Sequence, residues 1–191
     1  LAGFEPGDPY SCFAFETPLL ETIETKGQRL KIGFCRVNEL GPIHPDTVDV
    51  VSRVADKLAN VGHRVSESHP ERLFDKDVLD SWSFIFATVV GKALEAVKQG
   101  SGHELTENDV ERGTWVDYTR YKDSSLQEYM ATVALFNSFS RDIGQWWHGE
   151  DGFDVLITPT SARPAPVLGD LVSNPDDRTY LWRNTFTYTS Q

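Results

Sequence analysis

The stretch FDVLITPTSARPAP, residues 153–166, decides the fold. Val155 to Ile157 are three consecutive β-formers without polar alternation, which predicts a strand covered on both faces. Pro159 cannot donate to a β-ladder, so the chain should leave the sheet at Thr158. Covered strands of this kind are typical of α/β proteins, which place their sites on the loops that follow the strands.

A strand–helix–strand unit is predicted earlier in the chain. Residues 30–35 read as a strand, and residues 44–61 as a helix whose apolar residues recur every three or four positions. Pro45 suits the first helical position and Gly62 the C-terminal cap. A second strand follows over residues 63–68. Two strands joined in this way should lie parallel in one sheet.

A helical lobe without strands is predicted over residues 70–150. It should contain a long helix over residues 76–99, a short one over 105–112, and a second long one that starts after Ser125, where Glu128 completes a capping box. The predicted apolar face of the first long helix comprises Leu79, Trp82, Phe86, Val89 or Val90, Ala93 and Val97. That of the second comprises Leu126, Tyr129 or Met130, Val133, Phe136, Ser140, Ile143 and Trp147.

We therefore expect one α/β domain, a sheet flanked by helices with a helical lobe. Its segments are a loop-rich start over residues 1–29, the strand–helix–strand unit over 30–69, the lobe over 70–150, and a strand with a pocket-side loop over 151–191.

Composition narrows the function classes. The formal charge is −11, and no cluster of Lys and Arg is present, which argues against a nucleic-acid partner. No window approaches 18 uninterrupted apolar residues and no signal peptide opens the chain, so we expect no membrane partner and a cytoplasmic location. Cys12 and Cys35 fit reduced thiols better than a disulfide, which stays open.

A metal site is weighed and not favoured. His63, Glu67 and His69 would share one face of a strand and could join His44, but no closed four-ligand spacing appears. We predict no metal and no cofactor.

Residues 153–169 resemble the amidase signature family, in which a Phe/Tyr-Asp-Val-Leu strand is followed by Thr/Ser-Pro-Thr and a proline-rich run. Gly3 with Pro6-Gly7-Asp8-Pro9 resembles the segment after that family's nucleophile region. The order of the elements between the two matches agrees, and residues 186–191 resemble the approach to a late Gly-x-Pro-Ala segment. The subgroup that looks nearest is the aminohexanoate-cyclic-dimer hydrolases and general amidases.

The resemblance implies hydrolysis of a carboxylic amide by a Ser–cis-Ser–Lys triad, whose nucleophile lies in a Gly/Ser-rich loop. No such loop occurs in these 191 residues. We therefore expect an internal piece of an amidase, with the catalytic residues outside this chain and the chain inactive alone. The expected partner is a small-molecule substrate, and we expect this substrate to be a linear amide. Self-association or a homodimer is left open.

Candidate substrate contacts follow from the same resemblance, which places the loop 158–169 near the cleft. Thr158, Thr160 and Ser161 offer hydroxyls to a polar substrate, although such hydroxyls also satisfy the backbone of a tight turn. Trp82 and Phe86 are candidates for an apolar wall, although aromatic residues at helical spacing are more often core.

The segment Asn184-Thr185-Phe186-Thr187 resembles one that ends in Asp-x-Phe-Thr in tRNA-dependent amidotransferase A subunits, where the Asp recognises the amino group of glutamine. Asn184 cannot supply that charge, which favours a neutral amide over glutamine. Two other classes remain open at this point: a non-catalytic subunit that binds a partner through an exposed sheet, and an α/β binding domain of periplasmic type.

Overall fold

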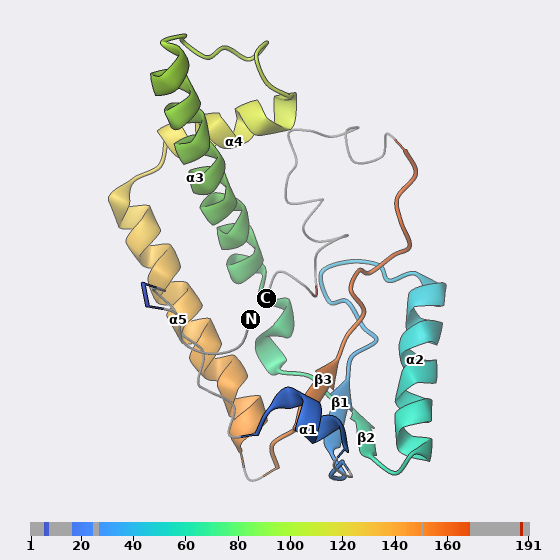
Figure 1. The fold of residues 1–191 in the computed structure, drawn as a ribbon. Helices are drawn as coiled ribbons and strands as arrows, with labels where there is room; N and C mark the ends of the chain where they lie inside the picture. The colour runs from blue at the N-terminus through green and yellow to red at the C-terminus, as the bar shows by residue number, and fades with distance from the viewer. Residues whose placement is uncertain (1–5, 8–16, 25–26, 150, 169–187, 189–191) are drawn as a thin grey trace.

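The computed structural model describes residues 6–7, 17–24, 27–149, 151–168 and 188. Its elements in chain order are α1 (Leu19–Glu24), β1 (Lys31–Phe34), α2 (Pro45–Asn60), β2 (Arg64–Glu67), the 3₁₀ helix η1 (Glu71–Phe74), α3 (Lys76–Ser101), α4 (Arg112–Lys122), α5 (Leu126–His148) and β3 (Val155–Ile157). The strands form one parallel sheet in the order β2-β1-β3. Figure 1 shows α2 on one side of this sheet and α5 on the other, so the predicted α/β class is confirmed.

The predicted strand–helix–strand unit is present as β1, α2 and β2. His44 caps α2, because its Nδ1 accepts from the amide of Asp46 at 3.2 Å, and Pro45 fills the first turn. Val51 and Ala55 are the buried residues of α2. The two strands pair in parallel with Ile32 opposite Val65. Local capping and periodicity were therefore enough to predict this unit.

Gly33 lets the C-terminal end of α5 approach the centre of the sheet. A Cβ at this position would lie 2.5 Å from Cζ2 of Trp146 and 2.8 Å from the carbonyl oxygen of Ser68. The indole of Trp146 donates from Nε1 to Oγ of Ser68 at 3.1 Å. Because successive residues of a strand face opposite sides, Gly33 and Cys35 face α5, whereas Ile32 and Phe34 face α2.

The first two residues of the stretch 153–166 fix how β3 joins the sheet. The carboxylate of Asp154 accepts from the amide of Lys31 at 2.7 Å, and the amide of Asp154 donates to the carbonyl of Lys31 at 2.8 Å. Phe153 stacks on Trp146 with ring centroids 4.3 Å apart and an interplanar angle of 2°. The Phe-Asp pair of the motif therefore has a structural role.

The strand itself is less covered than the sequence predicts. β3 ends at Ile157 as expected, but Val155 is 37% exposed. Within the described residues β3 pairs only with β1, so it is an edge strand and its outer side has no neighbouring strand. Because Val155 is exposed, the prediction of a strand buried on both faces is wrong.

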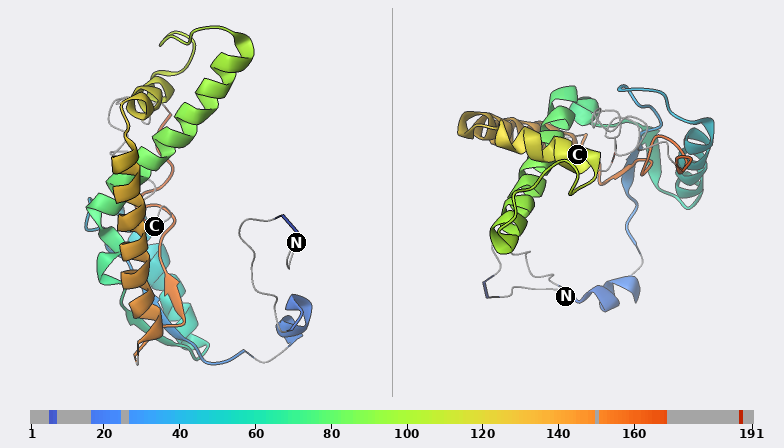
Figure 2. Two further views of the ribbon diagram at one scale, coloured as in Figure 1. Left: turned by 90° about the vertical axis from the view of Figure 1, so that its left-hand side faces the viewer. Right: turned by 90° about the horizontal axis from the view of Figure 1, so that it is seen from above.

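The helical lobe rises beside the sheet as α3, α4 and α5 (Figures 1 and 2). The predicted face of α3 is wrong in part, because Phe86 and Val97 are exposed. Of the two alternatives at the next position, Val89 is exposed and Val90 is half-buried. The buried residues of α3 are Val78, Leu79, Phe84, Ala87 and Gly91. A Cβ at Gly91 would lie 2.1 Å from Cγ of Tyr121, so the ring of Tyr121 rests on the backbone of α3 at this point. This close approach of α4 sets which face of α3 is buried.

Two details of the lobe differ from the prediction. The helix predicted over residues 105–112 is absent, because the carboxylate of Asp109 accepts from the amide and the hydroxyl of Thr106 at 2.7 Å each and closes a turn. The second long helix starts as predicted, with the amide of Glu128 donating to Oγ of Ser125 at 3.1 Å. However, the carboxylate of Glu128 pairs with Arg120, so only half of the capping box forms.

The beginning of α5 is exposed, which also differs from the predicted stripe. Leu126, Tyr129 and Met130 are 78%, 44% and 58% exposed. The buried residues of α5 are Thr132 and Phe139, further along the helix where it meets α3 and η1. Among the helices of the described part of the chain, none is both long and apolar enough to cross a membrane.

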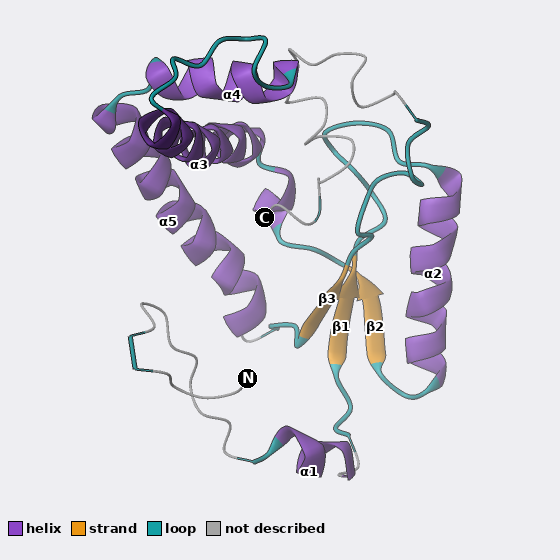
Figure 3. Ribbon diagram, turned by 45° about the horizontal axis from the view of Figure 1, so that its top comes forward, coloured by secondary structure: helices purple, strands orange, loops and turns teal. Residues whose placement is uncertain are grey.

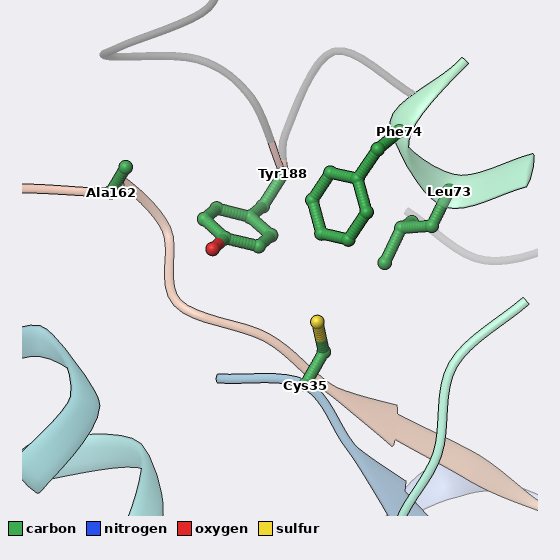
Figure 4. Close-up of a cluster of buried hydrophobic side chains, with 5 residues drawn as sticks. All are labelled: Cys35, Leu73, Phe74, Ala162 and Tyr188. Carbon is green, nitrogen blue, oxygen red and sulfur yellow. The ribbon is translucent and has the colours of Figure 1, made fainter. Parts of the chain in front are cut away.

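A cluster of buried side chains closes the space above the carboxyl end of the sheet. It comprises Cys35, Leu73, Phe74, Ala162 and Tyr188, which come from the residue after β1, η1, the loop after β3 and the C-terminal part of the chain (Figure 4). The hydroxyl of Tyr188 donates to the carbonyl of Val37 at 2.6 Å. Cys35 is a free, buried thiol, which agrees with the expectation of a reduced cysteine; Cys12 lies outside the described residues.

Candidate functional site

The loop after β3 is fixed at two points, which gives its hydroxyls a defined position. Ala162 is only 1% exposed because it inserts into the cluster of Figure 4. Its carbonyl accepts from the amide of His44, the cap of α2, at 2.8 Å. The segment between Thr158 and Ala162 therefore passes beside the first turn of α2. Figure 3 shows this loop running from β3 toward the N-terminal end of α2.

A groove of about 420 Å³ separates this loop from α2. Its α2 side is formed by Asp46, Thr47, Val50, Val51 and Val54. Its loop side is formed by Ile157, Thr158, Pro159, Thr160, Ser161, Arg163 and Pro164. The volume lies in the range of small-molecule pockets, and the lining combines an apolar floor with a few polar groups, as such pockets do.

The three predicted hydroxyls come together in this groove. Oγ of Ser161 accepts from the amide of Arg163 at 3.4 Å, which is the local turn contact that the sequence left open. The described part of the structure gives neither Thr158 nor Thr160 a side-chain hydrogen bond, so their hydroxyls are available to a ligand. Thr160 is exposed, and Thr158 is half-buried.

A second hollow, which we call the α5 hollow, lies on the opposite face of the sheet and measures about 230 Å³. Its apolar lining is Pro70, Leu73, Phe139, Ile143, Trp147 and Leu156. Two hydroxyl side chains, those of Thr158 and Tyr188, complete it. Thr158 thus borders both the groove and the α5 hollow, because it is the first residue after the edge strand β3.

The electrostatics of the α5 hollow are those of a neutral site. Burial raises the pKa of Tyr188 well above its usual range, so the phenol stays protonated at neutral pH. Burial likewise raises the pKa of the neighbouring Cys35 thiol, which opposes formation of a thiolate. Cys35 is therefore a packing residue here and not a nucleophile.

The two predicted aromatic contacts lie apart from these sites. Trp82 packs on Phe136 between α3 and α5, with ring centroids 5.4 Å apart. Phe86 is 41% exposed on α3. Neither side chain lines the groove or the α5 hollow, so a role for them in substrate binding stays a prediction. Asn184 lies outside the described residues and stays a prediction as well.

The histidines considered for a metal are used locally. Nδ1 of His63 accepts from the amide of Leu30 at 3.2 Å, and His44 caps α2. His69 packs edge-on against Phe74 with ring centroids 5.3 Å apart. Among the residues that the structure describes, no three His, Cys, Asp or Glu side chains converge on one point.

Sequence reasoning missed the α2 side of the groove and the α5 lining of the hollow. Val50 and Val54 read as ordinary members of an amphipathic helix, and Phe139 interrupts the predicted stripe of α5. A usable signal did exist for α2, since its sequence carries six valine or alanine residues spread around the helix, of which the structure buries only Val51 and Ala55. When a helix carries more apolar residues than the sheet beneath it can cover, part of its apolar face stays open to solvent or to a ligand.

Exposed apolar residues beside the groove carry a prediction. Val50, Val54 and Val155 are 49%, 39% and 37% exposed on the α2 side of the sheet. Exposed apolar clusters favour association, so the protein should self-associate or bind the dye ANS in dilute buffer. Dye fluorescence and light scattering are the measurements. Changing Val50 and Val54 to Lys should lower both signals, whereas Val97→Lys on the lobe should lower them less. A monodisperse monomer that binds no dye would contradict this prediction.

Comparison with known proteins gives one consistent group of relatives. No family model matches the chain. It is 28% identical over 174 residues to a 6-aminohexanoate-cyclic-dimer hydrolase of Paenarthrobacter ureafaciens, and the match covers 90% of this chain and 35% of that protein. The protein of the same name from Pseudomonas sp. (strain NK87) matches with the same identity and coverage. The chain therefore spans about a third of the length of the curated relatives it matches.

The solved structures agree with this similarity. A structure of 6-aminohexanoate cyclic dimer hydrolase superposes with a TM-score of 0.86 at 26% identity, covering 98% of this chain and 41% of that one. A structure of the hydrolase complexed with substrate superposes equally well. The chain is thus similar in sequence and fold to hydrolases of a cyclic amide, which supports the subgroup that the stretch 153–169 indicated.

Proposed function

We propose that this chain forms part of an amidase that hydrolyses a carboxylic amide. The observation that carries the proposal is the match to 6-aminohexanoate-cyclic-dimer hydrolases over nine-tenths of the chain, joined to a fold similarity of TM-score 0.86. These relatives are named for a cyclic dimer of 6-aminohexanoate. We therefore extend the expected substrates from linear amides to cyclic ones built from aliphatic units.

In this proposal the chain supplies the substrate side of the cleft and not the reacting groups. A Ser–cis-Ser–Lys triad needs a nucleophilic serine in a Gly/Ser-rich loop, and these 191 residues contain no such loop. The triad is then supplied by residues outside this sequence. The serine attacks the amide carbonyl, while the second serine and the lysine pass protons to the leaving amine.

The loop 158–164 is the part of the chain suited to hold the amide. Thr158 and Thr160 present hydroxyls that can donate to a carbonyl oxygen or accept from an amide N–H. Trp82, Phe86 and Asn184 remain proposed contacts for parts of the substrate beyond this loop.

The test compares two proteins: the 191-residue chain, and the translation product encoded by the full surrounding gene. A fluorophosphonate probe should label no serine of the 191-residue chain above a denatured control, and the chain should release no amine from the 6-aminohexanoate cyclic dimer. The longer product should be labelled and should hydrolyse amides.

Two results would overturn the proposal. One is stoichiometric labelling of a serine within the 191 residues. The other is a gene product, of whatever length, that hydrolyses no amide. The second result would favour a non-catalytic binding function, for which the exposed valines of α2 are the observation at hand.

A further inference from the structure

We propose that the α5 hollow binds the carbon chain of a small neutral aliphatic amide, with the polar end of the ligand at Thr158. The inference rests on the proposed function for its choice of an amide. It assigns that amide to a site on the α5 face of the sheet, away from the groove beside α2.

The walls of the hollow select an aliphatic group. Leu73 and Phe139 are buried at 6% and 9% exposure, and Ile143, Trp147 and Leu156 are half-buried around them. At about 230 Å³ the hollow is smaller than the pockets that take drug-sized ligands, about 300–1,000 Å³. A short carbon chain that displaces water from these walls gains the free energy of apolar burial.

The polar groups of the hollow select a neutral ligand. Among the described residues that line it there is no Asp, Glu, Lys, Arg or His, so a charged ligand would lose hydration without gaining a counter-charge from them. The phenol of Tyr188 is committed to the carbonyl of Val37 at 2.6 Å. The hydroxyl of Thr158, which has no partner in the described structure, is then the group left to donate to an amide carbonyl.

The position of Thr158 connects this hollow to the groove. The residue borders both spaces, and Thr160 and Ser161 follow it on the groove side. A chain held between α5 and η1 would therefore place its amide at the end of β3, beside the other hydroxyls of the loop. This geometry gives the helical lobe a role in binding through α5.

The test is a titration of the full 191-residue chain with hexanamide, followed by the methyl signals of its isoleucines in two-dimensional NMR. Ile143 reports the α5 hollow and Ile157 reports the groove. We expect a saturable shift at Ile143 that exceeds the shift at Ile157. Acetamide, which lacks the carbon chain, should bind at least about tenfold more weakly because it buries less apolar surface. Hexanoate, which is charged at neutral pH, should also bind at least about tenfold more weakly, because it loses hydration without gaining a counter-charge.

Variants separate the walls from the hydroxyl. Thr158→Val keeps the shape and removes the hydrogen bond, so affinity for hexanamide should fall about three- to tenfold. Ile143→Trp fills the hollow and should abolish saturable binding, followed at the Thr158 methyl. Val97→Trp makes the same kind of change on an exposed face of α3 and should leave binding unchanged. If Ile143→Trp does not fold, the proposal is tested by the Ile143 methyl shift of the parent protein and by the affinity of Thr158→Val for hexanamide.

The proposal is wrong if Ile143 does not respond to hexanamide, if Ile157 responds more strongly, or if hexanoate binds as well as hexanamide. These readouts require no turnover. Binding at Ile143 without hydrolysis by the longer gene product would uphold this site and overturn the proposed function. Hydrolysis by the longer gene product without a response at Ile143 would uphold the proposed function and overturn this site.

Discussion

Replacing Gly91 by alanine is expected to destabilise the fold by about 1–3 kcal/mol, the usual cost of forcing an extra group into a packed contact. The new Cβ would lie 2.1 Å from Cγ and 2.4 Å from Cβ of Tyr121, so α3 and α4 would have to move apart. For a chain of this size, that loss corresponds to a fall in Tm of about 2–4 °C per kcal/mol. Thermal unfolding followed by circular dichroism is the measurement.

Gly144 is the matched control, because it lies inside α5 and an added Cβ there would meet nothing within 4 Å. Gly144→Ala should stabilise the protein by about 0.5–1 kcal/mol, since glycine is a poor helix former. In a double-mutant cycle with Tyr121→Ala, the cost of Gly91→Ala should shrink, because the clashing ring is gone. A Gly91→Ala variant as stable as the parent would show that α3 and α4 do not touch at this point.

The contrast between Gly91 and His44 explains which parts of the fold the sequence predicts. His44-Pro45-Asp46 starts a helix through contacts within three residues, so the beginning of α2 was predictable. The buried face of α3 depends on a ring 30 positions further along the chain, and the helix's own pattern favoured Phe86 over the less apolar Gly91. A helix with apolar residues on several sides leaves the choice of face to its neighbours.

The same distinction applies to the candidate site. Thr158, Thr160 and Ser161 were predictable, because the prolines around them force the chain out of the sheet at the end of a strand. The α5 hollow was not, because its walls come from η1, α5, β3 and Tyr188, segments that are remote in sequence. Asp154 was read as part of a motif, and only the pairing of β3 with β1 shows that it binds the amide of Lys31.

The second large effect is expected at Asp75, which joins η1, α3 and α5. Its Oδ1 caps α3 by accepting from the amides of Asp77 at 2.9 Å and Val78 at 3.2 Å. Its Oδ2 accepts from Nε of Arg72 at 2.9 Å, and Arg72 also pairs with Asp142 of α5. Asp75→Ala removes the cap and one charged hydrogen-bond partner together, so it should cost about 2–3 kcal/mol of the free energy of unfolding.

The charge of Asp75 should also make stability depend on pH. Burial alone would raise the pKa of this carboxyl, but the hydrogen bonds from Arg72 and from the amides of α3 outweigh it, and the net pKa lies below its usual value. The unfolded chain therefore takes up the proton first as the pH falls, since a free Asp titrates near about pH 3.9. The contribution of Asp75 is fully present above that pH and is lost as the pH falls through the lower pKa of the folded state.

Asp75→Asn separates the charge from the cap, because asparagine caps helices about as well as aspartate. Urea unfolding between about pH 3 and pH 6 is the measurement, within the acid range where carboxylates titrate. The difference in stability between the parent and Asp75→Asn should be constant above about pH 5 and should shrink toward pH 3 as the parent loses its ion pair with Arg72. Asp142→Asn leaves intact both the cap that Asp75 makes on α3 and the pairing of Asp75 with Arg72. The stability of this variant should therefore fall with decreasing pH as that of the parent does. Parallel curves for the parent and Asp75→Asn down to pH 3 would mean that the carboxylate of Asp75 contributes nothing through its charge. The guanidinium of Arg72 would then be held at this corner by Asp142, by the hydroxyl of Ser138 and by its contact with Phe139.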